Sequence, residues 1–229
     1  MDICIDENDL WFALDFEGIA KYNKIKKEWR FYGKKDFPFF PCITNVLSSG
    51  RKFIWAGSKF HSCPAPVVRF NKKEQKWEEL KEFSNLDNKY KYPFTLKALK
   101  ADGDNVWMVF DTPLEYREID SKRMRYVTFK YNEEKDSLVE YPASPNHPFY
   151  NIDIDKDYIF FPLIETVYSK KDNAWVRLIT STVFLYRRPI YCDGPVCIDG
   201  NYLWGGGGGI ICFDKKLWLE MRKIFPENS

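Results

Sequence analysis

Histidine is scarce in this sequence of 229 residues, which contains only two of them. Imidazole is the commonest metal ligand and the usual acid or base at neutral pH, so a histidine-built metal site or catalytic centre is not expected. The six cysteines do not change this, because no two pairs of them have the spacing of a zinc site. We therefore expect no metal and no cofactor.

Long apolar runs and a strong charge of one sign are also missing. No segment approaches the roughly 20 apolar residues of a membrane-spanning helix, and residues 1–6 lack the basic and apolar regions of a signal peptide. With 35 basic and 33 acidic side chains, the formal charge is +2, so neither a nucleic acid nor a membrane is expected as a partner. The expected location is the cytoplasm, with free and mostly buried thiols, unless the chain was cut from an extracytoplasmic protein.

Aromatic residues, by contrast, make up 18% of the chain and follow an internal repeat. Five segments carry an aliphatic residue and then a bulky aromatic one, at intervals of 44, 52, 53 and 44 residues: Leu10-Trp11, Ile54-Trp55, Val106-Trp107, Ile159-Phe160 and Leu203-Trp204. In four of them an aspartate lies five residues before the aromatic, and Gly50 takes its place in the second. The Asp, Asn and Gly around this position predict a tight hairpin turn, because these residues tolerate positive φ.

A second column of large residues follows in each repeat. An aromatic residue precedes Asn, Ser or Asp at positions 23, 71, 132, 169 and 214. A large apolar residue comes six residues later in four copies and four residues later in the last: Trp29, Trp77, Leu138, Trp175 and Trp218. All eight tryptophans therefore fall into the two columns, and we interpret them as packing between neighbouring repeats.

Each repeat has room for four short strands. In the first repeat, alternating apolar residues and turn residues predict strands at 2–6, 9–14, 19–23 and 28–32. Four strands in about 46 residues is the unit of a β-propeller blade. The predicted fold is therefore an all-β, five-bladed propeller with four antiparallel strands per blade. It forms a single domain over residues 1–229, with blades at about 1–33, 42–80, 95–141, 150–179 and 195–225.

The fifth and first repeats also resemble a known family. Residues 199–205 read Asp-Gly-Asn-Tyr-Leu-Trp-Gly, and residues 209–214 read Gly-Ile-Ile-Cys-Phe-Asp. Residues 8–11 and 18–23, followed by Trp29, match nearly as well. This pattern is similar to the propeller repeat of two-component regulators. The resemblance implies a propeller that acts as a sensory or interaction module.

Binding residues are expected where the blade connectors meet. In a propeller, the loops between second and third strands and the connectors share one face, and loops on a rigid scaffold carry function. Here the connectors are rich in Pro, Phe, Tyr and Arg, and Tyr and Arg are favoured binding anchors. An alternative is that these connector side chains only cover the mouth of the propeller's central channel and bind nothing. The candidate binding residues on this connector face are Phe40, Tyr92, Phe94, Tyr116, Arg117, His147, Tyr150, Arg187, Arg188 and Tyr191.

Two functions are compatible with this pattern. The first is a non-catalytic monomer that binds a protein partner, a small molecule or a glycan at the channel mouth, since no catalytic motif is present. The second is a propeller enzyme of the lyase or glycoside hydrolase type, which needs two carboxylates about 5–10 Å apart. The acids near the connector face are Asp36, Asp111, Glu115, Glu165 and Asp193. The recurring Asp6, Asp102, Asp155 and Asp199 are poor candidates, because they lie in turns on the opposite face.

Overall fold

The computed structural model describes residues 2–37, 45–58, 67–80, 95–111, 126–141, 152–160, 166–177, 196–205 and 210–216. They belong to two compact units, Met1–Asn146 and His147–Ser229, and each unit is described by itself. Every strand in both units pairs with neighbours that are antiparallel to it and adjacent to it in the chain. We call each sheet a blade and number the blades in chain order.

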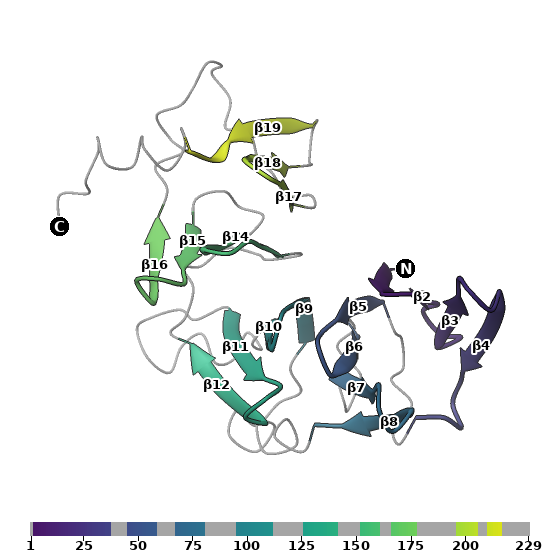
Figure 1. Ribbon diagram of the computed structural model, residues 1–229. Helices are drawn as coiled ribbons and strands as arrows, with labels where there is room; N and C mark the ends of the chain where they lie inside the picture. Colours follow the sequence, from purple (N-terminus) through teal and green to yellow (C-terminus); the bar gives the residue numbers. More distant parts are fainter. Residues whose placement is uncertain are drawn as a thin grey trace. The chain divides into compact units, whose positions relative to one another are not determined.

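The first unit contains three four-stranded blades (Figure 1). Blade 1 consists of β1 (Asp2–Asp6), β2 (Asp9–Ala13), β3 (Ile19–Asn23) and β4 (Glu28–Tyr32). Blade 2 consists of β5 (Val46–Ser49), β6 (Phe53–Gly57), β7 (Val67–Asn71) and β8 (Lys76–Glu79). Blade 3 consists of β9 (Thr95–Asp102), β10 (Asn105–Asp111), β11 (Tyr126–Asn132) and β12 (Ser137–Tyr141).

The second unit contains two blades. Blade 4 consists of β13 (Asp153–Ile154), β14 (Tyr158–Phe160), β15 (Thr166–Ser169) and β16 (Ala174–Arg177). In blade 5 the described strands are β17 (Val196–Asp199), β18 (Tyr202–Gly205) and β19 (Ile211–Asp214). The strand β19 follows the run of glycines that begins at Gly205 in the sequence. The predicted all-β class and four-stranded antiparallel unit are confirmed. That one domain spans residues 1–229 stays a prediction.

The four strands predicted for the first repeat are those of blade 1, except that β2 ends one residue earlier, at Ala13. The reason is a tight turn after the strand. Leu14 donates its backbone N–H to the carbonyl of Gly18 over 2.9 Å, and Asp15 has a φ of 51°. Leu14 still bonds to Gly18 in register with the β2–β3 ladder, and the chain then turns at Asp15.

Both hairpin turns of the repeat use the left-handed backbone region. In the turn after the first strand, Glu7, Gly103 and Gly200 have positive φ in blades 1, 3 and 5. In the turn after the third strand, positive φ recurs at Lys27, Gln75, Asp136 and Asn173. The polar residue that ends the third strand caps this second turn. Asn71 Oδ1, for example, accepts the backbone N–H groups of Lys73 and Glu74, both over 3.1 Å.

The two tryptophan columns pack against opposite neighbours. Trp11 and Ala13 of β2 point toward blade 2 and share a buried cluster with Ile54 and Trp77. Trp55, on the other face of blade 2, is buried in a second cluster with residues of blade 3, and Leu138 packs against that cluster. The first column therefore faces the next blade along the chain, and the second column faces the preceding blade.

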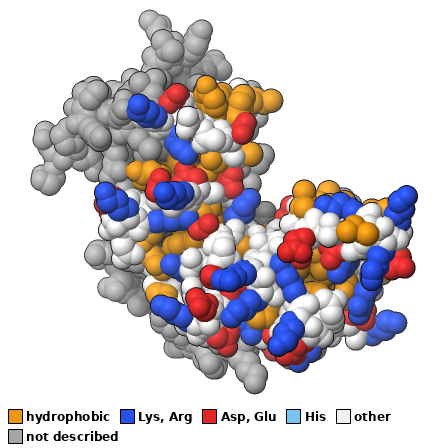
Figure 2. Space-filling model, in the orientation of Figure 1, with side chains coloured by type: hydrophobic (Ala, Val, Ile, Leu, Met, Phe, Trp, Pro, Cys, Tyr) orange, Lys and Arg blue, Asp and Glu red, His pale blue; other side chains and the backbone are white. Residues whose placement is uncertain are grey.

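Two tryptophans depart from the interpretation that the columns are buried between repeats. Trp29 is 53% exposed and Trp204 is 39% exposed. Trp29 lies on the face of blade 1 that a preceding blade would cover, and Trp204 on the face of blade 5 that a following blade would cover. Figure 2 shows hydrophobic side chains at the surface of both blades. For Trp175 and Trp218, the side chains lie outside the part of the chain that is described.

Candidate functional site

All ten residues predicted for the connector face lie outside the described residues. They are Phe40, Tyr92, Phe94, Tyr116, Arg117, His147, Tyr150, Arg187, Arg188 and Tyr191. The described strands show only at which end of each sheet the connectors that contain these residues begin and end. In an antiparallel sheet with strands in chain order, the turns after the first and third strands lie at one end, and the other connections leave from the opposite end. The ten residues therefore stay a prediction.

The acids of the enzyme alternative are not brought together in the described part of the chain. Asp36 has a local role, because its Oδ2 accepts the backbone N–H of Gly33 over 2.9 Å. Asp111 ends β10, but only its backbone is described, and Glu115, Glu165 and Asp193 lie outside the described residues. An enzyme built on these acids is neither supported nor opposed.

The recurring aspartates lie at the start of the first hairpin turn of their blades, and two of them also join neighbouring blades. Asp6 Oδ1 of blade 1 lies 2.5 Å from Lys72 Nζ of blade 2. Asp155 Oδ2 of blade 4 lies 2.8 Å from Lys215 Nζ of blade 5. Each lysine also donates to a turn carbonyl of its own blade, Lys72 to Gly50 over 2.6 Å and Lys215 to Gly200 over 3.0 Å. One ammonium group thus ties two blades at their turn ends.

Between blades 2 and 3 the same place is filled differently. Gly50 replaces the aspartate in blade 2, and Glu133 replaces the lysine in blade 3. The Glu133 side chain is buried, and its carboxylate accepts Trp55 Nε1–H and the backbone N–H of Lys52, both over 2.6 Å. A Cβ on Gly50 would lie 2.0 Å from Glu133 Oε1, so only glycine leaves room for this contact.

The inner strands that line the start of each blade are joined in a related way. Ser48 Oγ of β5 accepts the backbone N–H of Ala101 in β9 over 2.8 Å. Asp153 Oδ2 of β13 accepts the N–H of Ile198 in β17 over 2.7 Å. Both acceptors hold the same position in their strands, opposite the aromatic residue. They satisfy N–H groups of an edge strand that has no ladder partner on that side.

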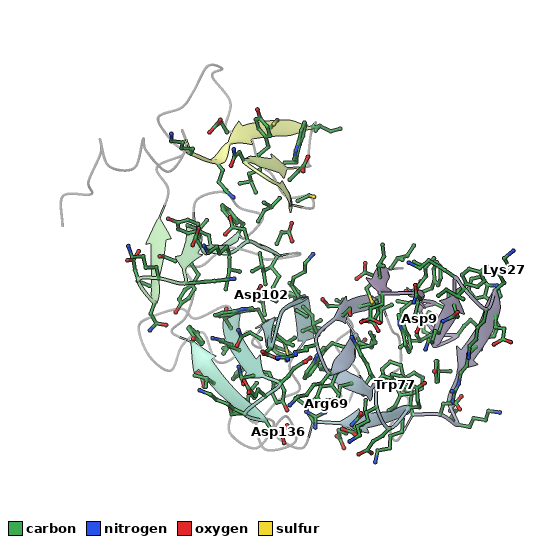
Figure 3. All side chains as sticks on the ribbon, viewed as in Figure 1. Asp9, Lys27, Arg69, Trp77, Asp102 and Asp136 are labelled. Atoms are coloured by element: carbon green, nitrogen blue, oxygen red, sulfur yellow. The ribbon has the colours of Figure 1, made fainter. Side chains whose placement is uncertain are left out.

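Arg69 adds a further link between blades 2 and 3 at the surface. Its Nε lies 3.1 Å from Glu78 Oε2 in its own blade, and one of its other nitrogens lies 3.1 Å from Asp136 Oδ1 in blade 3 (Figure 3). The same nitrogen donates to Tyr131 Oη. The guanidinium also stacks over the Phe53 ring at 4.2 Å. Polar and aromatic contacts therefore fix these two blades together.

The exposed face of blade 1 is the clearest candidate binding surface in the described residues. It holds an apolar hollow of about 350 Å³, lined by Phe12, Leu14, Ala20, Trp29 and Phe31. The Trp29 ring lies 5.5 Å from the Phe12 ring and 6.1 Å from the Phe31 ring, which is 66% exposed. Exposed aromatic clusters of this kind mark interaction surfaces. Sequence reasoning misses this surface, because it interprets both tryptophan columns as packing between neighbouring repeats.

Three described cysteines, Cys4, Cys197 and Cys212, are free thiols. Cys4 packs against the core between blades 1 and 2, where burial and the nearby Asp2 and Asp6 raise its thiol pKa to about 12. The expectation of mostly buried thiols is wrong for Cys197 and Cys212, which are exposed. Cys197 holds the same position as Cys4 in its blade, but its side chain is exposed.

Two further findings concern the described residues alone. No group of three or more His, Cys, Asp or Glu side chains is placed there to hold a metal ion. The described part also contains no helix long and apolar enough to cross a membrane. The absence of a cofactor and of a membrane partner stays a prediction.

Comparison with known proteins finds similarity at the level of structure. The chain matches no family model and no curated protein. The extracellular domain of BT4673 from B. thetaiotaomicron, named as a one-component system, superposes with a TM-score of 0.61 at 13% identity, over 92% of this chain and 27% of that one. A chain of the nidogen/laminin complex gives 0.60 at 8% identity, over 93% and 74%.

A designed protein, Ika8, is also similar, with a TM-score of 0.58 at 9% identity. The match covers 93% of this chain and 57% of the Ika8 chain. The chain thus spans about a quarter of the length of the BT4673 extracellular-domain chain and just over half of the Ika8 chain. Identities this low show a shared fold and nothing finer, and they support a propeller-like architecture for this chain.

Proposed function

We propose that this chain is a non-catalytic recognition propeller, in which blades held rigidly together present the connector face to a protein, a small molecule or a glycan. The observation that carries the proposal is that acidic side chains at the turn ends of the blades bond across blade interfaces. Asp6, Asp155 and the buried Glu133 are each bonded across a blade interface. Their oxygens stabilise a scaffold, and a scaffold with fixed loops is what recognition requires.

The structural comparisons support the same proposal. The similarity to the extracellular domain of BT4673 favours a sensing role, and the resemblance of the repeats to those of two-component regulators points the same way. The proposed ligand would lie against Tyr116, Arg117 and the other aromatic and arginine residues of the connectors. These side chains supply large contact areas and directed hydrogen bonds.

A ligand screen on the full chain tests the proposal. Thermal unfolding is followed against panels of peptides, oligosaccharides and small metabolites, because a ligand that binds only the folded chain raises the melting temperature. For a hit, the double variant Tyr116→Ala and Arg117→Ala is expected to weaken binding at least tenfold. The control Lys26→Ala, in a turn at the opposite end of blade 1, is expected to bind normally. Turnover of any compound in the panel would contradict a non-catalytic role.

A further inference from the structure

The connector that follows blade 1 begins with a closed turn. The backbone N–H of Asp36 donates to the carbonyl of Gly33 over 2.9 Å, and the N–H of Gly33 donates to Asp36 Oδ2 over 2.9 Å. These two reciprocal bonds form directly after Tyr32, the last residue of β4. Asp36 thus fixes the backbone at the point where the connector leaves blade 1.

Phe37, the next residue, lies in the interface between blades 1 and 2. Its side chain is only 6% exposed, and its ring centroid lies 4.8 Å from that of Trp77 in blade 2. It shares a buried cluster with Trp11 and Ala13 of blade 1 and with Ile54 of blade 2. Among the described residues, every other buried member of this cluster belongs to a strand. Phe37 is therefore the point where the connector enters the packed core.

The repeat does not require an aromatic residue at this place. Three residues after the second column, Tyr32 and Leu80 are buried in the equivalent positions of blades 1 and 2. Five residues beyond Tyr32 the sequence has Phe37, but five residues beyond Leu80 it has the polar Asn85. The repeat thus supplies its own large residues for the blade interface. What Phe37 adds is an attachment of the connector to that interface.

The same connector leads directly to a residue that the sequence predicts to bind. Phe40 follows Phe37 after Pro38 and Phe39, and Pro41 comes next. Proline fixes its own φ and restricts the residue before it, so this sequence permits few backbone conformations. An extended chain spans at most about 3.6 Å per residue, so the Cα of Phe40 can lie no farther than about 11 Å from that of Phe37. An anchor at Phe37 therefore limits where Phe40 can lie.

We propose that Phe37 is a positioning residue of the connector face: its ring anchors the first connector, so that Phe40 is held near blades 1 and 2 before a ligand binds. The proposal rests on the proposed function, because it concerns how that face is prepared for binding. Phe37 is buried, so it acts through Phe40 and not by contact with a ligand. A connector that is already ordered loses less conformational entropy on binding, which favours affinity.

Limited proteolysis of the full chain, without ligand, tests the anchor. Chymotrypsin can cut after Phe39, beside Phe40, whereas Phe37 and Phe40 are each followed by proline and resist it. Cleavage needs local opening, so its rate reports how tightly the connector is held. Phe37→Ala is expected to raise the rate of cleavage after Phe39 about tenfold or more, measured by mass spectrometry of the fragments. Phe37→Leu, which keeps an apolar side chain in the cluster, is expected to raise it less than about threefold.

Two controls separate loss of the anchor from general unfolding. Phe16→Ala makes the same change at a side chain that is 69% exposed, and it is expected to leave cleavage after Phe39 unchanged. Trypsin cleavage after Lys26 and Lys27, in a turn at the opposite end of blade 1, is expected to be as slow or as fast in Phe37→Ala as in the unaltered chain. Acceleration at those lysines by the same factor would show that the variant loosens the whole blade, and it would overturn the proposal.

Asp36→Ala keeps the proposal testable if Phe37→Ala does not fold. It removes the acceptor of the Gly33 N–H and leaves the Phe37 ring in place. Trypsin cleavage after Lys35, inside the turn, is expected to rise about tenfold, whereas cleavage after Phe39 stays slow because Phe37 still holds the segment beyond the turn. Equal acceleration at both places, or rapid cleavage after Phe39 in the unaltered chain, would overturn the proposal. Failure of the ligand screen would contradict the proposed function alone, since no ligand takes part in these measurements.

Discussion

The contact between Gly50 and Glu133 allows a sharp test of how the blades are held together. Glu133→Ala removes the acceptor of two N–H groups, Trp55 Nε1 and the backbone of Lys52, at a buried site. Each buried N–H left without a partner costs about 1–3 kcal/mol, so the free energy of unfolding is expected to fall by about 2–6 kcal/mol. The measurement is urea-induced unfolding at 25 °C, followed by tryptophan fluorescence.

Gly50→Ala is expected to destabilise the chain through the same two bonds. The new Cβ would lie 2.0 Å from Glu133 Oε1 and 2.8 Å from its Cδ, so the carboxylate must move away from both donors. The expected loss is again about 2–6 kcal/mol. Gly33→Ala is the matched control, because a Cβ there meets nothing within 4 Å. The control is expected to leave stability unchanged or raise it by about 0.4–1 kcal/mol.

The double variant Gly50→Ala with Glu133→Ala tests whether the two residues destabilise the chain through the same contact or independently of each other. Once Glu133 is alanine, the methyl group at position 50 no longer displaces a carboxylate. The losses are therefore expected to overlap, and the double variant should be about as stable as Glu133→Ala alone. If the two losses add, or if Gly50→Ala behaves like Gly33→Ala, the two residues are not coupled and the reasoning fails.

Three further predictions concern single positions. Burial raises the thiol pKa of Cys4 to about 12, so Cys4 is expected to react with iodoacetamide at pH 8 about a thousandfold more slowly than the exposed Cys197. Mass spectrometry of peptides measures both rates, and equal rates would contradict the burial of Cys4. Burial also raises the pKa of Tyr32 to about 12, so the folded chain keeps this proton while the unfolded chain loses it near 10.0. Stability should therefore decline between about pH 10 and 12, and Tyr32→Phe should show a shallower decline in urea unfolding. Lys27→Gly relieves a φ of 58° and is expected to add about 0.5–1 kcal/mol, whereas a loss of stability would mean that the lysine side chain matters more than its backbone.

The sequence predicted the blade well because the repeat records local chemistry. Turn residues such as Asn23 and Asn71 are needed wherever a third strand turns back, since their side chains cap the turn. The aromatic residue of β2 must alternate with its aliphatic neighbour, since successive side chains in a strand point to opposite faces. Both constraints act within a few residues, so they leave a pattern that can be recognised without the fold.

The candidate binding surface could not be predicted in the same way. Alternation places Leu10 and Trp11 on opposite faces, but it does not say which face meets the next blade and which the preceding one. That assignment depends on how blades pack in three dimensions, and it decides that Trp29 is exposed while Trp77 is buried. The connector residues that composition singled out are untested for a different reason, because they lie outside the described residues.

Exceptions to the repeat carry as much structural information as the repeat itself. The aspartate column is broken once, at Gly50 in blade 2, and the lysine column is broken once, at Glu133 in blade 3. Both breaks meet at one interface, where the buried carboxylate fills the space that the missing side chain leaves. A departure in one repeat that is matched in the next is therefore a sequence signal for a contact between blades.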